Sequence, residues 1–480
     1  SSTCGIITSS NSKPFAMCTQ DTICAIATAQ GGAIGVIRIS GKDAIAITDR
    51  IFTPVGKHPL PLSERKAYTM AFGHIRQDDG EIIDEVLIGL FKSPHSYTGE
   101  DCVEISCHGS SFILQQVMQL LIRKGCRAAG PGEFTQRAFL NGKMDLSQAE
   151  AVADLIASSS AATHRMAMNQ MRGGFSRELS ALRERLLHLT SLMELELDFS
   201  DHEELEFADR SELETIAGDI EKVISGLVHS FSVGNVLKNG IPVAIVGETN
   251  AGKSTLLNTL LNEEKAIVSD IHGTTRDVIE DTVNLSGITF RFIDTAGIRD
   301  THDTIENMGI ARSFHKMEQA AIVLWVVDNT CAEAQIRQLS PRILPLCSNK
   351  QLIILLNKSD QVSAVPTKLS GLPENTVTLS ISAKEKTGIQ ELQNLLVKTA
   401  SVPELTSSDL IVTNVRHYEA LSLALEDIHR VQNGLQTHLS GDFISQDLRE
   451  CLFHLAEIVG GEITADEVLG NIFMKFCIGK

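Results

Sequence analysis

The sequence has too few basic residues for a protein that holds nucleic acid by itself. Its 480 residues include 60 Asp and Glu against 42 Lys and Arg, which leaves a net charge of −18. A surface that binds nucleic acid is normally basic, because neutralising phosphates supplies most of the affinity. We therefore expect any RNA partner to be held locally or through another protein.

Long apolar runs are also missing. The longest, residues 320–327, has the length of a buried strand and is too short to cross a bilayer. Residues 1–20 are rich in Ser and Thr and lack the apolar core of a signal peptide, and with Lys13 but no Arg they fit a transit peptide poorly. We expect residues 1–20 to be a disordered extension, with Met17 a candidate start, in a cytoplasmic protein that contacts no membrane.

No two of the ten cysteines form a C-x-x-C pair. The nearest two, Cys102 and Cys107, belong to the alternating stretch CVEISCH, which is typical of a strand rather than of a metal site. The cysteine pattern therefore predicts reduced thiols of a cytoplasmic protein.

The most specific stretch is IPVAIVGETNAGKSTLLNTL, residues 241–260. An apolar run leads into G-x-x-x-x-G-K-S, Gly247 to Ser254, and a helical pattern follows, which is the context that a phosphate-binding loop requires. In such a loop, small residues let backbone N–H groups converge on phosphate oxygens at a helix N-terminus. Lys253 is placed to reach the β and γ phosphates, and Ser254 to ligate Mg²⁺.

Three later motifs, in the right order, exclude a chance match, and one of them selects the base. RFIDTAG places Asp294 after an apolar strand, aimed at the magnesium shell, and leaves Gly297 free to donate its N–H to a γ phosphate. LIILLNKSD ends an apolar strand at 357–360. There the Asp360 carboxylate accepts from the ring N–H and the exocyclic amine of guanine, whereas adenine presents an acceptor at the ring position. SISAK, residues 380–384, fits the loop behind the guanine carbonyl. Together the motifs indicate a GTPase.

The hydrolytic step is less ordinary. The residue after the D-T-A-G motif is Ile298, where Ras-like enzymes commonly have a glutamine that orients water, and an isoleucine cannot do this. Water positioning and charge relief must therefore come from elsewhere. The stretch SDIHGTTRD, residues 269–277, and Asn250 provide oxygen-rich surroundings that suit a hard monovalent cation.

The periodicity predicts a multidomain chain of α/β and α+β parts. Strand-helix alternation over 236–402 predicts a Ras-like P-loop GTPase domain with a doubly wound, mostly parallel sheet. Residues 21–140 mix strand-like alternation with one amphipathic helical stretch and predict an α+β domain. Residues 141–235 and 403–480 are helical, and neither half has an obvious way to bury its apolar stripe alone. We expect one all-α helical domain, split by the inserted GTPase domain.

Several further stretches match one family. They are GVIRISG, YTGED, GPGEFTQRAFLNGKMDLSQAEAVADLI and the terminal CIGK, beside GETNAGKS, GTTRD and DTAGIR. With this set the chain closely resembles the MnmE (TrmE) family of tRNA modification GTPases, from about residue 21 to residue 480. Only the leading extension lies outside the resemblance.

The resemblance implies a particular task. Family members are homodimers that work with a flavoprotein partner, MnmG, in a heterotetramer. Together they add an aminomethyl or carboxymethylaminomethyl group to C5 of the wobble uridine of certain tRNAs, and 5-formyl- or 5,10-methylene-tetrahydrofolate is the one-carbon donor. FAD belongs to the partner, which we expect to hold much of the tRNA. GTP hydrolysis is stimulated by potassium and accompanies pairing of two GTPase domains, while the N-terminal domain binds folate and dimerises.

The family's functional residues are assigned here by position. Glu306, in DTIENMG, matches the catalytic carboxylate that positions the attacking water. Ser254 and Thr275 match the magnesium ligands. The matching potassium ligands are Asn250, Ser269, Ile271 and Thr274. The expected GTP-binding residues are Asn250, Ala251, Gly252, Lys253, Ser254, Thr255, Ser269, Asp270, Ile271, His272, Gly273, Thr274, Thr275, Asp294, Thr295, Ala296, Gly297, Asn357, Lys358, Ser359, Asp360, Ser382, Ala383 and Lys384.

The expected folate-binding residues are Arg38, Glu104, Lys143 and Lys480. A pterin presents amine and ring N–H donors that suit a carboxylate, and its glutamate tail suits cationic side chains. We expect the last helix to deliver the terminal CIGK tail to the folate site. Gly31 stands where the family often has an arginine, so a contact made there is lost or replaced.

Two other functions stay open at the level of the sequence. A regulatory GTPase switch in ribosome or RNP assembly would have the same nucleotide motifs but would not need a folate pocket. A stand-alone folate-dependent methyltransferase would not need nucleotide-driven switching. Folate binding by residues 21–140 is the property that separates the family's function from the GTPase switch.

Overall fold

The computed structural model describes residues 21–199, 210–265, 281–293, 317–362, 371–373, 376–400, 410–461 and 466–479. The chain divides into two compact units. The first joins the residues up to Ile156 to Gln170–Ile220 and Glu426–Lys480, and the second joins Ala157–Asn169 to Glu221–Leu425. None of the described helices is both long and apolar enough to cross a membrane.

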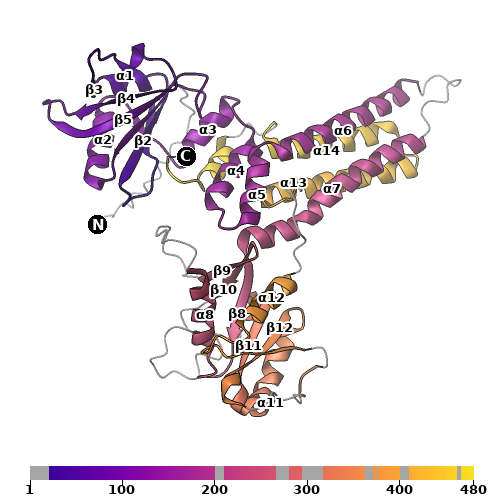
Figure 1. Ribbon diagram of the computed structural model, residues 1–480. Helices are drawn as coiled ribbons and strands as arrows, with labels where there is room; N and C mark the ends of the chain where they lie inside the picture. Colours follow the sequence, from indigo (N-terminus) through magenta and orange to yellow (C-terminus); the bar gives the residue numbers. More distant parts are fainter. Residues whose placement is uncertain are drawn as a thin grey trace, which may run out of the picture. The chain divides into compact units, whose positions relative to one another are not determined.

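The first unit begins with a mixed sheet, as the α+β prediction for this region requires (Figure 1). Over residues 21–128 the strand order is β3-β4-β5-β6-β2-β1-β7, and neighbouring strands are antiparallel except for β1 and β7. The strands are β1 (Ile23–Ile26), β2 (Ile34–Ser40), β3 (Phe52–Pro54), β4 (Thr69–Arg76), β5 (Ile82–Phe91), β6 (Cys102–His108) and β7 (Arg127–Ala128).

Helices α1 (Ala44–Asp49) and α2 (Ser111–Arg123) cover one face of this sheet. Leu120 on α2 is fully buried in the same apolar core as the inward-facing strand residues, as the helical periodicity predicts. Side chains alternate between the two faces along a strand, so every second residue points away from these helices, to the opposite face of the sheet. That face exposes Met70 and Phe72 on β4 and Leu87 on β5, and Phe72 stands opposite Leu87.

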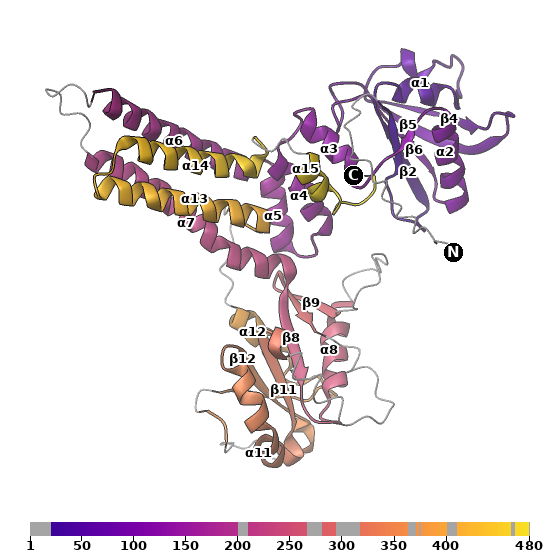
Figure 2. The same ribbon diagram turned by 180° about the vertical axis from the view of Figure 1, so that it is seen from behind.

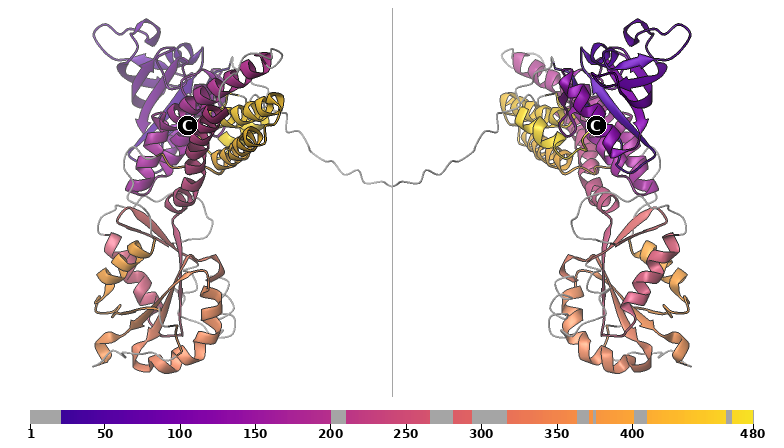
Figure 3. Two further views of the ribbon diagram at one scale, coloured as in Figure 1. Left: turned by 90° about the vertical axis from the view of Figure 1, so that its right-hand side faces the viewer. Right: turned by 90° about the vertical axis from the view of Figure 1, so that its left-hand side faces the viewer.

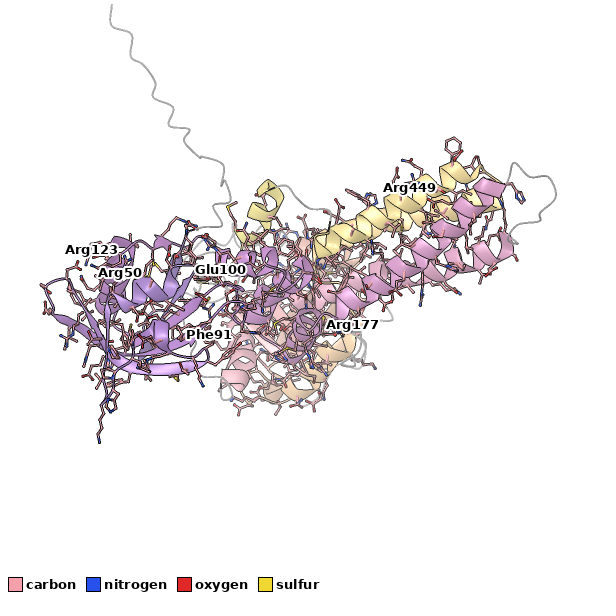
Figure 4. All side chains as sticks on the ribbon, turned by 90° about the horizontal axis from the view of Figure 1, so that it is seen from above. Arg50, Phe91, Glu100, Arg123, Arg177 and Arg449 are labelled. Carbon is pink, nitrogen blue, oxygen red and sulfur yellow. The ribbon has the colours of Figure 1, made fainter. Side chains whose placement is uncertain are left out.

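A cluster of charged side chains lies beside the β1 end of the sheet. Arg137, on α3 (Glu133–Leu140), is almost completely buried and donates to Asp21 at 2.6 Å and to Glu100 at 3.1 Å. Glu100 is labelled in Figure 4. Glu133 forms ion pairs with both Arg127 and Arg137. Burial raises the pKa of Asp21 and of Glu133, but the neighbouring arginines outweigh it and hold the pKa of each carboxyl below its usual value.

This cluster predicts a loss of stability in acid. A carboxyl whose pKa is lowered by folding stabilises the protein above its unfolded pKa, and this contribution is lost as the pH falls through the folded pKa. We therefore expect the melting temperature to decline from about pH 5 downward. The double variant Asp21→Asn with Glu133→Gln should melt lower at pH 7 but decline less between about pH 5 and about pH 3, as measured by calorimetry. The exposed pair Asp79→Asn with Glu64→Gln is the control, and equal acid slopes in all three proteins would contradict the assignment.

Long helices follow the sheet. Helices α6 (Gly174–Phe199) and α14 (Gly441–Val459) are far apart in the sequence but pack along each other (Figure 2). Arg449 on α14 pairs with Glu194 on α6 at 3.3 Å. The remaining helices outside the nucleotide motifs are α4 (Leu146–Ala157), α5 (Ala161–Met171), α7 (Arg210–Asn239), α13 (Val415–Gln436) and α15 (Asp466–Phe473).

The second unit contains a sheet of order β13-β12-β11-β8-β10-β9, counted over its described residues, and only β9 and β10 pair antiparallel. Its two faces are covered by helices, α8 and α12 on one and α11 on the other (Figure 3). This is the doubly wound pattern that the strand-helix alternation predicts. The elements are β8 (Ile241–Val246), α8 (Lys253–Lys265), β9 (Asp281–Leu285), β10 (Ile288–Phe292), β11 (Ile322–Asp328), α11 (Ala332–Ile343), β12 (Gln351–Asn357), β13 (Val377–Ser380) and α12 (Ile389–Ala400).

Candidate functional site

The glycine loop joins the buried strand β8 to the first turn of α8. Gly252 has φ +98°, a conformation that a residue with a side chain rarely adopts. A Cβ at this position would lie 2.1 Å from Nδ2 of Asn357. Asn250 also has a positive φ of 65°. The loop is therefore a close-fitting cradle of backbone at a helix N-terminus, the arrangement that suits a phosphate group.

Asn357 joins three sequence-predicted motifs in one place. Its side chain is buried, its Nδ2 donates to the carbonyl of Ala251 at 2.8 Å, and its Oδ1 accepts from the N–H of Ala383 at 3.0 Å. Ala251 belongs to the glycine loop and Ala383 to the SISAK loop. Both hydrogen-bonding groups of the amide are thus used inside the protein, and Asn357 ties the glycine loop and the SISAK loop to the start of the NKSD motif.

Asp360 itself faces Ser382. The hydroxyl of Ser382 donates to Asp360 Oδ1 at 2.6 Å and accepts from the N–H of Glu385 at 3.2 Å. Asp360 is exposed, and this one protein partner orients its carboxylate within the described part of the chain. A carboxylate held in this way can accept the two N–H groups of guanine that the sequence argument assigns to it.

The ammonium groups of the two motif lysines lie against protein oxygens. Lys253 Nζ donates to the carbonyls of Gly247 at 2.8 Å and Glu248 at 2.6 Å. Lys358 has a left-handed φ of 64°, and its Nζ donates to Asp328 at 2.5 Å. Burial raises the pKa of Asp328, but the hydrogen bonds from Lys358 and Thr330 and the charge of Lys358 together outweigh it and keep that pKa below its usual value. The Asp328 carboxylate is therefore charged and paired at neutral pH.

The other predicted nucleotide residues lie partly inside and partly outside the described ranges. Ser254 and Thr255 occupy the first turn of α8, where the Ser254 hydroxyl suits a magnesium ligand. Ser359 begins the short turn after Lys358, and Lys384 is exposed in the loop after Ala383. The residues outside the described ranges are Ser269, Asp270, Ile271, His272, Gly273, Thr274, Thr275, Asp294, Thr295, Ala296, Gly297 and Glu306.

A second candidate site lies on the first unit, where Arg38 on β2 stands opposite Glu104 on β6. Arg38 Nε donates to Glu104 Oε1 at 2.9 Å, and its guanidinium lies 5.6 Å from the ring centre of Tyr97 and 5.7 Å from that of Phe134. Two strands, an ion pair and two aromatic rings thus converge. Lys143 instead donates to the carbonyl of Pro94 at 3.0 Å, and its ammonium shares no bond with this pair.

The C-terminal segment reaches the same arginine. Arg38 Nη1 donates to the carbonyl of Gly479 at 3.1 Å, and Ile478 forms an antiparallel bridge with Pro131. The N–H of Gly132 donates to the carbonyl of Cys477, and the Cys477 side chain is exposed. Lys480 lies outside the described residues. The structure therefore brings the tail to Arg38 and Glu104, two of the residues that the family resemblance assigned to folate.

Two polar residues that contact the nucleotide motifs, Asp328 and Gln335, were not predicted from the sequence. Asp328 ends the apolar strand β11 at the edge of the sheet where ligands bind, so its position in the sequence was a usable signal. Gln335 lies inside α11, and no sequence pattern distinguishes it from other helical glutamines.

The doubly wound sheet, the glycine loop and the junction at Asn357 define a P-loop guanine-nucleotide-binding protein. The family model described as "MnmE helical domain" matches residues 146–477, and the one described as "GTP-binding protein TrmE N-terminus" matches residues 22–143. The chain belongs to the family of the tRNA modification GTPase MnmE.

Close relatives match almost the whole chain. The tRNA modification GTPase MnmE of Bacteroides thetaiotaomicron is 66% identical over 467 residues, which are 96% of this chain and 100% of that protein. The protein of the same name from Flavobacterium johnsoniae is 52% identical over 473 residues, 97% of this chain and 100% of that one. A crystal structure of a single-residue variant of Aquifex aeolicus Era bound to GDP·AlF4⁻ is 26% identical, covers 39% of this chain and 66% of that chain, and has a TM-score of 0.25.

Proposed function

We propose that this chain is a potassium-dependent GTP hydrolase of the cytoplasm. With a flavoprotein partner of the MnmG kind in a heterotetramer, it adds an aminomethyl or carboxymethylaminomethyl group to C5 of the wobble uridine of certain tRNAs. A tetrahydrofolate donates the one-carbon unit, and FAD belongs to the partner. Family membership makes the chain a GTP-hydrolysing enzyme of tRNA modification. The observation that carries the proposal is the buried junction at Asn357, where three nucleotide motifs meet.

Different residues bind the base, the phosphates and the magnesium ion. Asp360, oriented by Ser382, accepts from the guanine N–H groups. Lys253 exchanges the loop carbonyls for oxygens of the β and γ phosphates. Ser254 and Thr275 hold Mg²⁺, which supplies charge neutralisation at the phosphates.

Hydrolysis is assigned mainly to residues outside the described ranges. Glu306 positions the attacking water, because Ile298 cannot. Ser269, Ile271 and Thr274 hold K⁺ together with Asn250, whose positive φ turns the glycine loop at that point. The ion supplies the positive charge that an arginine provides in other GTPases.

The folate site is assigned to Arg38, Glu104, Lys143 and Lys480. A carboxylate can accept the N–H donors of a pterin, and a cationic side chain can bind the carboxylates of its glutamate tail. The Arg38 guanidinium lies near two aromatic rings and also donates to the carbonyl of Gly479, so it joins the aromatic side of this site to the C-terminal tail. Lys143 would have to leave the carbonyl of Pro94 to contribute.

The variant Arg38→Met should bind 5-formyltetrahydrofolate at least about tenfold more weakly than the wild type, because a charged hydrogen-bonding group is lost. Calorimetric titration measures this. Arg50→Met is the matched control, since Arg50 is exposed in the same sheet domain and is labelled in Figure 4. Deleting residues 478–480 should also weaken binding. Unchanged affinity in both altered proteins would contradict the site, and no heat with the wild type would favour the GTPase switch.

The open face of the sheet supports the proposed homodimer. Met70, Phe72 and Leu87 are 65%, 47% and 44% exposed on neighbouring strands. Exposed apolar side chains gathered on one face mark interaction surfaces in soluble proteins. Because the family forms homodimers through the N-terminal domain, we infer that a second copy of the chain covers this face.

The experiment that tests the whole proposal is reconstitution with the flavoprotein partner, followed by mass spectrometry of the wobble nucleosides. The complete mixture contains tRNA, GTP, K⁺ and the folate donor. The expected result is a modified wobble uridine in the complete mixture and little product when Na⁺ replaces K⁺ or the folate is omitted. Unmodified tRNA in the complete mixture, with GTP still hydrolysed, would favour a switch function. Equal product in Na⁺ would remove the potassium assignment alone.

A further inference from the structure

A chain of side-chain contacts links the glycine loop to the base-reading motif along the edge of the second unit's sheet. Gln335 Nε2 donates to Glu248 Oε2 at 3.0 Å, and Gln335 Oε1 accepts from the N–H of Asp328 at 2.9 Å. Asp328 in turn pairs with Lys358 at 2.5 Å. Glu248 belongs to the glycine loop and Lys358 to the NKSD motif. The two ends of the nucleotide site are therefore connected through α11 and β11.

Gln335 has properties suited to this place. It is 7% exposed, and within the described part of the chain both functional groups of its amide are used, one as donor and the other as acceptor. The donor faces a carboxylate and the acceptor faces a backbone N–H, so the amide fits both neighbours in one orientation only. A leucine would fill the volume but satisfy neither neighbour, and a glutamate would satisfy only the N–H.

The Asp328 carboxylate, which pairs with Lys358, is itself held by other hydrogen bonds. Its Oδ1 accepts from the N–H of Thr330 at 3.0 Å and from the Thr330 hydroxyl at 2.7 Å, while Oδ2 takes the ammonium of Lys358. Its own N–H is tied to Gln335. The aspartate backbone and both carboxylate oxygens are thereby restrained, so the Lys358 side chain is directed toward one fixed acceptor.

We propose that Gln335 and Asp328 are positioning residues for the guanine nucleotide, which hold Glu248 of the glycine loop and Lys358 of the base-reading motif in one arrangement. Neither needs to touch the nucleotide. Their effect is to preorganise the two contact regions, so that less ordering is required when the nucleotide binds. This inference rests on the nucleotide binding that the proposed function assigns to the loop and motif.

The test exchanges the partners of one hydrogen bond. Gln335→Glu places a carboxylate against Glu248 and should speed release of GDP on the order of tenfold, because a charge-assisted bond becomes a repulsion. Glu248→Gln alone keeps an acceptor for Gln335 but removes the charge from that bond, so release should be faster than in the wild type but slower than in Gln335→Glu. The double variant puts an amide donor on the loop and a carboxylate on α11, so both bonds return and release should approach the wild-type rate. Gln338→Glu makes the same change on the exposed side of α11 and is the control.

Release of a fluorescent GDP analogue by stopped flow measures the effect, and steady-state kinetics should show a raised KM for GTP with kcat unchanged. Emission from Trp325, the sole tryptophan and a buried residue of β11, reports whether each variant is folded. Equal release from the Gln335→Glu and Gln338→Glu proteins would overturn the inference. So would a double variant that regains the wild-type melting temperature but still releases GDP fast, since the role would then be structural only. A wild-type chain that binds no GDP would instead defeat the proposed function itself.

Discussion

The variant Asn357→Asp should lose GDP binding and melt at a lower temperature than the wild type. The substitution changes one amide nitrogen to an oxygen and keeps the size and shape of the side chain. The carboxylate can still accept from the N–H of Ala383, but its second oxygen faces the carbonyl of Ala251, to which the wild-type amide donates at 2.8 Å. Two acceptors then meet in a site where Asn357 is only 3% exposed.

The expected size follows from the cost of an unpaired charge in the interior. Leaving such a charge without a partner costs about 3–5 kcal/mol, and for a region of this length that corresponds to a drop in melting temperature on the order of 10 °C. The fluorescence of Trp325 follows the unfolding of this sheet, because that side chain is fully buried in its core. Binding of a fluorescent GDP analogue is measured on the same samples at a temperature where the variant is folded.

Asn394→Asp is the matched control, since Asn394 is exposed on α12 and needs only its Oδ1, which accepts from Gln390. This control should melt and bind like the wild type. If Asn357→Asp did so as well, the amide would not be the tie between the three motifs, and the assignment of the junction would be wrong.

The sequence predicted the ordered elements of the nucleotide site but could not predict what fixes them together. The apolar run and the glycine pattern suffice to place β8, the loop and α8, because strand, turn and helix preferences are local. The contacts of Asn357 with Ala251 and Ala383 join residues that are 106 and 26 positions apart in the sequence. Such contacts depend on the order and register in which the parallel strands pair, and no local sequence pattern determines these.

The same distinction applies to the sheet of the first unit. Alternation predicts that Arg38 and Glu104 lie in strands, but their pairing depends on the register of β2 against β6. The burial of Arg137 was also missed, because a lone arginine in a helical stretch normally faces water. Its partners Asp21 and Glu100 come from separate loops, and only the folded chain brings three charges to one place.

A change of base preference is expected from the variant Asp360→Asn. Guanine presents a ring N–H and an exocyclic amine, and a carboxylate accepts from both. Xanthine has a carbonyl in place of the amine, so an asparagine can donate its amide N–H to that carbonyl and still accept from the ring N–H. The asparagine carbonyl oxygen can also keep the bond from Ser382, which donates to Asp360 at 2.6 Å in the wild type.

Affinity for GTP should fall on the order of 100-fold or more, because the guanine amine is left facing another donor and one charged acceptor is lost. Xanthosine triphosphate should bind to the variant more tightly than GTP does and should be hydrolysed, since the residues at the phosphates are unchanged. Competition against a fluorescent GDP or XDP analogue measures both affinities. Glu333→Gln, on an exposed position of α11, removes the same charge elsewhere on this unit and should leave the preference for guanine intact. Asp360→Asn could instead keep its preference for GTP, or lose both nucleotides while remaining folded. In either case Asp360 would not be the residue that reads the base, and its hydrogen bond with Ser382 would have only a structural role.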